Sequence, residues 1–509
     1  AGHTGAIHVE ARIGEVSLTP GIRGRGFAQI GHGGYNAHGN HNTNMVSDGT
    51  QTTATLQDGI TVIAGTSVGM LREAHPTSQG VGDRSYGQIG LGGWGAAGRF
   101  SGDINITAGT FFLMEAGEGQ EAYRQVGHGG AHRIETNQAA YQQNSGNLSP
   151  DNGHATFSGN ISITAGGNVE AYSGSRDARS YAMIGHGGIH RTADYRLDGA
   201  VVAETEWGHH GDIDLNAGGS VIVQAKPRAS ALRARFVNNQ NWARVGHGGY
   251  DSKGDHWGDI SIAAAEGNVI VQSGLGGYEE YRPNNHDYGG AQTGAQNFIQ
   301  IGHGGFRPGL FRVGDTRHNN GSRRFLDNGN KEQNGIGNVT GTTSDITITA
   351  GADFELLAQN EIGDLLSFQT SQFENDETTG VPTTVTRDPR IRAQQNWAHV
   401  GHGGLGEGNA ARTINRTAAT VGSIAITTGG NLKVQAGQIP QIDLVTTTGS
   451  NGEIGRSTAP GGVDYLEQNW SQIGHGGFNY ETGYTGNVFL NAGGDVDIQG
   501  GLSEFDFAR

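Results

Sequence analysis

The sequence predicts an all-β chain that forms a single continuous right-handed parallel β-helix (a β-solenoid) of about nine coils with long corner loops. Three observations predict this fold. A block containing Gly-His-Gly-Gly recurs along the 509 residues, a second block of alternating apolar and polar residues follows each copy, and insertions occur at two fixed places between them. No stretch shows a sustained period of 3.6 residues, so no helix is expected. The right hand follows from the strong preference of parallel β-crossovers for that hand.

The first block reads aromatic, usually small, usually polar, Ile or Val, and then Gly-His-Gly-Gly, as in Phe27 to Gly34. The aromatic position is filled in all eight copies, and the histidine in seven, with Leu91 in its place once. The aromatic residues are Phe27, Tyr86, Tyr123, Tyr181, Trp242, Phe298, Trp397 and Trp470. The histidines are His32, His128, His186, His247, His303, His402 and His475, preceded by His3. Equal places in a repeat predict that each set forms a ladder along the stack.

The second block reads Gly-polar-Ile-x-Ile-x-Ala-Gly, then a short turn and Val-x-Val, as in Gly211 to Gly218 followed by Val221 and Val223. Alternation that is rich in Ile, Val and Thr and ends in Ala-Gly is typical of half-buried strands. Each coil therefore has about three short strands with glycine corners. The expected coils are approximately 1–29, 30–88, 89–125, 126–183, 184–244, 245–300, 301–399, 400–472 and 473–509, all in one domain, 1–509.

The insertions follow either Gly-His-Gly-Gly or Val-x-Val. Examples of the first kind are 35–57, 131–158 and 306–343, and of the second kind 274–297, 357–396 and 437–469. Loops that leave a solenoid at fixed corners do not disturb the stack. Because these loops are polar and variable, we expect recognition to lie there.

Composition agrees with a thin core and excludes several classes of function. Glycine occurs 91 times and hydrophobic residues make up 34%, which suits a narrow solenoid core. The net charge of −16 disfavours nucleic acid and anionic membranes as partners. No apolar window is long enough to span a membrane. The absence of cysteine excludes disulfides and thiolate metal sites.

The histidines are expected on the inward face, because a period of two places Ala28, Ile30 and His32 on one side of a strand. Buried imidazoles this close cannot all be charged. We therefore expect neutral rings, each hydrogen-bonded to the backbone at the Gly-Gly turn or to the next ring. A metal ladder is the alternative, but single imidazoles without carboxylates or thiolates at fixed spacing make a poor site. No metal and no cofactor are predicted.

The aromatic ladder has the opposite parity and is expected outside the coil. Covering by the chain's own loops is one outcome, and an exposed stripe that stacks on glycans is the other. Two further columns recur. An amide ladder is expected from Gln29, Gln88, Gln125, Gln300 and Gln472. A possible calcium column consists of Asp103, Asp212, Asp259 and Asp345, although it lacks the nonapeptide spacing of calcium-binding β-rolls.

The Ile-x-Ile-x-Ala-Gly-Gly-x-Val-x-Val repeats resemble those of filamentous haemagglutinin-like adhesins and of the exported partners of two-partner secretion systems. The added Ile-Gly-His-Gly-Gly element is similar to that of large filamentous adhesins and exoproteins in the same group. The resemblance covers essentially the whole chain as a repeat pattern, but the family's amino-terminal secretion cap is not identified in it. It implies an exported right-handed parallel β-helix, located outside the cell or at its surface.

These observations predict a non-enzymatic structural or adhesive module. The expected partners are further copies of itself, and glycans or a surface receptor, with no nucleic acid and no membrane. Two alternatives stay open: a carbohydrate-binding rod that uses the aromatic column, and a β-helix polysaccharide lyase or hydrolase. The enzyme would need a unique cluster of acids or bases, whereas the regular features here recur in every coil.

The two ends of the chain are expected to match. Phe507, Ala508 and Arg509 repeat the start of the first block, and Ala1, Gly2 and His3, followed by Thr4-Gly5, are a weak form of its remainder. This predicts an end-to-end junction in register. The chain is then either a segment of a longer solenoid or a subunit that stacks head to tail into a filament.

Overall fold

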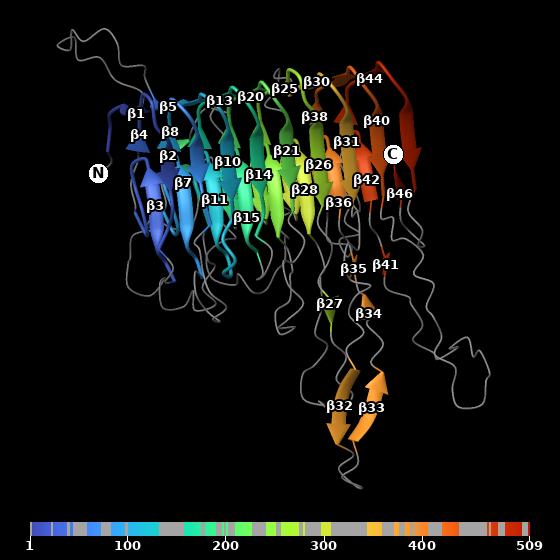
Figure 1. Ribbon diagram of the computed structural model, residues 1–509. Coiled ribbons are helices and arrows are strands. Elements are labelled where there is room, and N and C mark those ends of the chain that lie inside the picture. Colours follow the sequence, from blue (N-terminus) through green and yellow to red (C-terminus); the bar gives the residue numbers. More distant parts are fainter. Residues whose placement is uncertain are drawn as a thin grey trace, which may run out of the picture.

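Figure 1 shows the computed structural model of the chain, an elongated stack of parallel strands. The structure describes residues 3–21, 24–37, 41–43, 59–72, 83–96, 100–131, 157–174, 179–189, 196–197, 200–201, 209–225, 241–250, 256–273, 278–279, 297–306, 344–358, 371–375, 382–386, 390–391, 393–394, 397–405, 420–436, 466–467, 470–476, 484–500 and 507–508. These residues contain strands and turns and no helix, so none crosses a membrane as a helix. The predicted β-solenoid is confirmed. Most of both kinds of insertion lie outside the described residues.

Three parallel sheets of nine strands each run the length of the stack, one strand per coil. Sheet I holds β1 (Ile7–Ala11), β5 (Ile60–Ala64), β9 (Ile104–Ala108), β13 (Ile161–Ala165), β20 (Ile213–Ala217), β25 (Ile260–Ala264), β30 (Ile346–Ala350), β39 (Ile424–Thr428) and β44 (Val488–Ala492). Sheet II holds β2 (Val16–Leu18), β6 (Val68–Met70), β10 (Phe112–Glu115), β14 (Val169–Tyr172), β21 (Val221–Gln224), β26 (Val269–Ser273), β31 (Phe354–Ala358), β40 (Leu432–Gln435) and β45 (Val496–Gln499).

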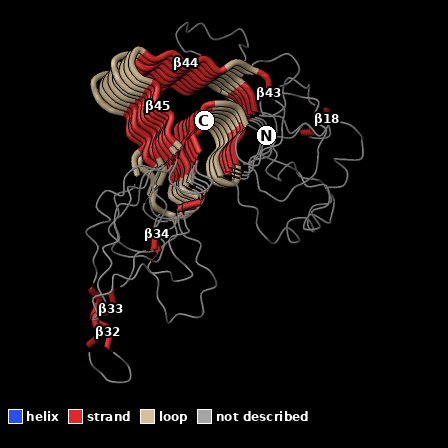
Figure 2. The backbone as a smooth tube through the Cα atoms, turned by 90° about the vertical axis from the view of Figure 1, so that its right-hand side faces the viewer, coloured by secondary structure: helices blue, strands red, loops and turns tan. Residues whose placement is uncertain are grey.

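Sheet III carries the aromatic start of the first block. It holds β3 (Phe27–Ile30), β7 (Tyr86–Ile89), β11 (Tyr123–Val126), β15 (Tyr181–Ile184), β22 (Trp242–Val245), β28 (Phe298–Ile301), β36 (Trp397–Val400), β42 (Trp470–Ile473) and β46 (Phe507–Ala508). Viewed along the axis, the coils superimpose, with β44 and β45 in the last one (Figure 2). Nine coils at ~4.8 Å each make a stack of roughly 43 Å.

Two shorter parallel sheets flank these. One joins β4 (His41–Asn42), β8 (Phe100–Ser101), β12 (Phe157–Ser158), β19 (His209–His210) and β24 (His256–Trp257). The other joins β16 (Gly187–Ile189), β23 (Gly248–Tyr250), β29 (Gly304–Phe306) and β37 (Gly403–Leu405). Five two-stranded pairs complete the described strands: β17 (Arg196–Leu197) with β18 (Ala200–Val201), β27 (Tyr278–Glu279) with β34 (Arg390–Ile391), β32 (Ser371–Asn375) with β33 (Pro382–Thr386), β35 (Ala393–Gln394) with β41 (Leu466–Glu467), and β38 (Thr420–Val421) with β43 (Tyr484–Thr485).

The register follows the repeat, as predicted. The apolar residue before each Gly-His-Gly-Gly pairs with its counterpart in the next coil, which gives the column Ile30, Ile89, Val126, Ile184, Val245, Ile301, Val400 and Ile473. These residues and the inward Ile, Val, Leu and Ala of sheets I and II form one core. Alternate residues of sheet I are buried and exposed, as in Ile104 to Ala108, because successive side chains of a strand point to opposite faces.

Candidate functional site: the histidine corner and its neighbouring ladders

The Gly-His-Gly-Gly segments turn the chain away from sheet III and point each histidine inward. Backbone packing is so close there that only glycine fits. At Gly246 the φ angle is +140°, and a Cβ atom would lie 2.1 Å from the carbonyl oxygen of Gly302 in the next coil. The equivalent glycines, such as Gly185 and Gly302, meet the same obstacle. Glycine therefore recurs at this corner because neighbouring coils touch through their backbones.

Six histidine rings stack in consecutive coils. Adjacent ring centroids are 4.6 to 5.0 Å apart and the planes are nearly parallel, in the order His128, His186, His247, His303, His402 and His475. The first five are fully buried. The strand spacing of a parallel sheet imposes this separation. The structure thus brings the predicted ladder together from His128 onward, while Leu91 separates it from His32.

Both nitrogens of each stacked ring are committed. Nδ1 accepts the backbone N–H of the residue at the same place in the preceding coil, for example from Leu91 to His128 at 3.0 Å and from His186 to His247 at 2.9 Å. Nε2 lies 2.7 to 2.8 Å from the carbonyl oxygen that precedes a sheet I strand, at Gly102, Gly159, Gly211, Gly258, Ser344 and Gly422. A carbonyl only accepts, so Nε2 must carry the proton. Each ring is therefore neutral, with the proton on Nε2.

Burial keeps these rings neutral in the folded state. It lowers the pKa of His128 to about 4, against the opposing effect of the Gly102 carbonyl. It lowers the pKa of His303 to about 3, with Gly258 opposing and the Arg244 charge adding to the effect. Burial is also the first cause of the strongly lowered pKa values of His186, His247 and His402, with neighbouring histidines next. The expected neutral, backbone-bonded rings agree with this geometry, except that the bonded carbonyls precede the sheet I strands.

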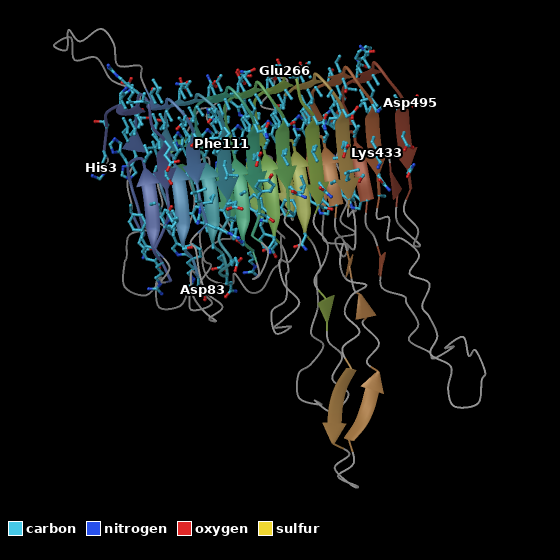
Figure 3. The ribbon with its side chains drawn as sticks, viewed as in Figure 1. His3, Asp83, Phe111, Glu266, Lys433 and Asp495 are labelled. Atoms are coloured by element: carbon cyan, nitrogen blue, oxygen red, sulfur yellow. The ribbon has the colours of Figure 1, made fainter. Side chains whose placement is uncertain are left out.

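His3 takes a different place from the other histidines of the predicted ladder, although its ring also stacks on His32 at 5.8 Å. The His3 ring stacks on His41 at 5.0 Å, its backbone N–H donates to His41 Nδ1 at 3.1 Å, and Thr4 pairs with Asn42. His3 lies at the N-terminal end of the stack (Figure 3). His3 stands two residues before Gly5, just as Phe100 stands two residues before Gly102. It therefore belongs to a second column of rings. The His32 ring has its own carbonyl partner, the oxygen of Gly5 at 3.0 Å.

This second column was missed by sequence reasoning. After His41 come Phe100, Phe157, His209 and His256, whose rings stack at 4.5 to 5.3 Å. All five are buried. The signal was present, since a ring stands two residues before the glycine that opens the second block in Phe100-Ser101-Gly102 and His256-Trp257-Gly258. The alternation of phenylalanine and histidine obscured it.

The aromatic ladder lies on the outer side of sheet III and is covered. From Tyr86 to Trp470 its members are fully buried in a cluster separate from the main core, with Trp94, Ile189 and Tyr250 packed on it. Adjacent rings stack at 4.2 to 5.4 Å. Only Phe27, at the N-terminal end, is 48% exposed. An exposed stripe of these rings for glycans does not agree with this burial.

The glutamine column does not form the expected amide ladder. Gln88 Nε2 donates to the Leu91 and Gly127 carbonyls at 3.1 and 3.0 Å, and Gln300 Nε2 to the carbonyls of Gly401 and Gly403. The side chains thus serve the backbone of the glycine corner. In the same column the buried Arg244 donates to the carbonyls of Gly302, Gly304 and His247. An amide-to-amide bond occurs elsewhere, from Gln224 to Gln272 at 2.8 Å.

The acidic column is a ladder of backbone acceptors. Oδ1 of Asp103 accepts the Asn160 N–H at 2.8 Å, and the same bond joins Asp212 to Asp259 and Asp259 to Asp345. Asn160 and Ser423 occupy this place in other coils and accept in the same way. The requirement is for an acceptor oxygen and not for a charge. Within the described part of the chain, no group of three or more His, Cys, Asp or Glu could hold a metal ion.

The structure describes three of the six residues of the predicted end-to-end junction, His3, Phe507 and Ala508. Phe507 and Ala508 pair with Trp470 and Ser471, so they are the ninth strand of sheet III. At the other end, the pairing of Thr4 with Asn42 places His3 beside His41. Ala1, Gly2 and Arg509 lie outside the described residues.

The described ladders can hold coils together, and their contacts repeat from coil to coil. Comparison of the chain with protein-family models, with curated proteins and with solved structures finds no match.

Proposed function

We propose that this chain is a non-enzymatic structural module, an axial part of an extracellular or cell-surface β-solenoid whose ends are extended by further coils. The supporting observation is the state of its last described coil. Val496 and Ile498 are 53% and 50% exposed, although they continue inward columns that are buried in every earlier coil from the second onward. A further coil stacked on β44 and β45 would cover these side chains and use the open strand edges.

The first described coil offers a matching surface. Ile7 and Val9 are only partly buried, whereas Ile60 and Val62, one coil further in, are fully buried. An apolar end that meets an apolar end through parallel strands is a heterologous contact, which yields a fibre. The added coil comes either from the same longer chain or from a second copy. A surface receptor or glycan partner is part of this proposal, with the insertions as the place for it.

Electron microscopy of the native material tests the shaft. We expect a particle much longer than nine coils, with the strand spacing along its axis. A short particle, or a capping element that seals the coil at Ile473 to Arg509, contradicts the proposal.

A pair of variants tests the contact itself. Ile498→Asp places a charge on the end surface, and Phe111→Asp places one at a similarly exposed position, 44%, on the side of the stack (Figure 3). We expect only Ile498→Asp to reduce end-to-end association in analytical ultracentrifugation. A purified chain that stays monodisperse at high concentration refutes self-stacking.

The two alternatives, a carbohydrate-binding rod and a polysaccharide lyase or hydrolase, gain no specific observation from the described residues. The rod would need ring faces that Tyr86 to Trp470 do not expose. The enzyme would need a group of acids or bases peculiar to one coil. Glu121, the buried carboxylate of the described residues that differs between coils, is paired with Arg84 and Arg179.

A further inference from the structure

The six stacked histidines serve as connectors between coils and not only as core filler. Each Nδ1 accepts an N–H from the preceding coil, and each Nε2–H reaches a carbonyl at the corner that leads into sheet I. Backbone bonds already join neighbouring coils beside each histidine, as from the Gly187 N–H to the His128 carbonyl. The His186 imidazole adds a bond to the His128 N–H of the preceding coil. This connection requires an unprotonated Nδ1.

We propose that the column His128 to His475 is an acid-sensitive lock, which joins the coils at the Gly-His-Gly-Gly corner in neutral medium and, in the isolated chain without a further coil on its end, opens from the His475 end in weak acid. A proton on Nδ1 turns the acceptor into a donor that faces another N–H. The bond between the coils is lost, and a charge is left among buried rings. Both effects favour separation of the corner backbones.

The charged groups around the column do little to stabilise a positive charge on one of its rings. The titratable or charged groups that face it from other elements are His210, His256, Arg244, His399 and Asp345. Four of these five are basic and oppose a positive charge on the ladder. The one carboxylate, Asp345, faces His475.

The order of opening follows from this arrangement. His475 is only partly buried, its pKa is lowered by burial, and the Gly422 carbonyl and the Asp345 charge act in the opposite direction. It is the ring best placed to take up the first proton. Its Nδ1 then releases the His402 N–H, which it accepts at 3.3 Å, the longest bond of the series. Opening then proceeds toward His128, one coil at a time.

The test is a nitrogen-15 NMR titration of the whole chain with labelled histidine, from pH 7.5 to 4. We expect protonated Nε2 and unprotonated Nδ1 in the ladder at neutral pH, with His475 titrating first. Amide protection, measured relative to an unstructured peptide at the same pH, should fall at least tenfold for His402 before it falls for Leu91. A proton on Nδ1 at neutral pH, or simultaneous titration of all ladder rings near 6.5, overturns the proposal.

A variant separates the lock from general acid effects. In His402→Asn, the amide oxygen keeps an acceptor near the place of Nδ1 but cannot titrate. The His303 N–H, which donates to His402 Nδ1 at 3.1 Å, should then keep its protection in weak acid. The control is His8→Asn, which replaces a partly exposed ring on the outer face of β1. Equal loss of His303 protection in both variants contradicts the lock, and if His402→Asn does not fold, the titration order of the native chain decides.

Discussion

The corner that leads into sheet I carries two ladders of side-chain acceptors, one on its inner side and one on its outer side. The Gly102 carbonyl faces His128 in the interior, while the next residue, Asp103, points outward and accepts the Asn160 N–H. Both ladders satisfy backbone N–H groups between coils. They differ in burial, since the histidines from His128 to His402 are fully buried, whereas Asp212 and Asp259 are exposed and Asp103 is half-buried.

This difference in burial explains which residue types occur in each ladder. On the outer side water can replace a missing acceptor, so Asp, Asn and Ser all occur there. On the inner side an unpaired group costs more, because no water replaces the lost bond. The inner place holds histidine or, once, the apolar Leu91, whose own N–H still donates to His128. We therefore expect the inner ladder to contribute the larger share of the stability.

Acid should have the largest effect, because it acts on all six rings of the inner ladder, whose pKa values are all lowered. The pKa of His128 is lowered from 6.5 to about 4, so the unfolded state binds protons more readily between these values. The stability that neutral His128 contributes is complete above pH 6.5 and is lost as the pH falls toward 4. This amounts to roughly 3 kcal/mol for that ring, at 1.36 kcal/mol per unit. Urea unfolding at several pH values measures it.

The column is expected to titrate as a coupled set, so the loss is spread over the acid range. An unfolding free energy that stays constant from pH 7 to 4.5 would falsify the dominance of the inner ladder.

Gly246→Ala should be among the most damaging single substitutions at this corner. The new Cβ would lie 2.1 Å from the Gly302 oxygen, on a backbone with φ of +140°. We expect a loss on the order of 4 kcal/mol or failure to fold. Gly14→Ala is the control, because nothing lies within 4 Å of its Cβ position. Thermal melts of the two variants compare them, and similar melting temperatures would show that the corner can widen.

Ile301→Ala gives the scale of the core behind both ladders. Ile301 is fully buried between Val245 and Val400. Removing its side chain should cost about 2–5 kcal/mol, depending on how far the coils relax. Ile13→Ala, at a residue that is 93% exposed, should change stability by less than about 0.5 kcal/mol. A loss below 1 kcal/mol at Ile301, measured by urea unfolding, would mean that the coils close over the cavity.

The smallest effect is expected on the outer ladder, with the opposite sign. The pKa of Asp259 is raised from 3.8, first by desolvation, with the charges of Asp212 and Asp345 adding to the effect. A raised carboxyl pKa means that protonation favours the folded state, so this contribution is complete below pH 3.8 and is lost as the pH rises above 3.8 through the raised pKa. Asp259→Asn keeps the acceptor and removes the repulsion. At pH 7 we expect an equal or slightly higher melting temperature, and a clear decrease would show that the charge itself is needed.

Most of the fold could be predicted from the sequence, because the same two blocks recur many times along the chain. Inward Ile and Val in the second block, and the invariant place of Ile30 to Ile473, define strands and register without knowledge of any other coil. Period two also places His32 and its equivalents inward and the aromatic residues outward. The presence and order of the two main ladders therefore follow from local pattern.

Three features required the tertiary structure. Parity places Trp242 outside the coil, but only the following strand, with Tyr250, decides that it is covered. Spacing aligns Gln88 with Gln125. The backbone carbonyls at the corner are nearer than the next amide, so the side-chain amide of Gln88 donates to the carbonyls of Leu91 and Gly127. The motif Ala-Gly-His suggested one column for His3, whereas pairing of Thr4 with Asn42 puts it in another.

The sequence by itself therefore determined which residues recur and which way they face along each strand, because strand geometry is local. Only the tertiary structure decided what each side chain meets, because its partners lie in the next coil, up to about a hundred residues away, as His303 and His402 do. Insertions of unequal length separate these partners in the chain but not in space. The protonation of Nε2 and the proposed acid-sensitive lock follow from these contacts between coils.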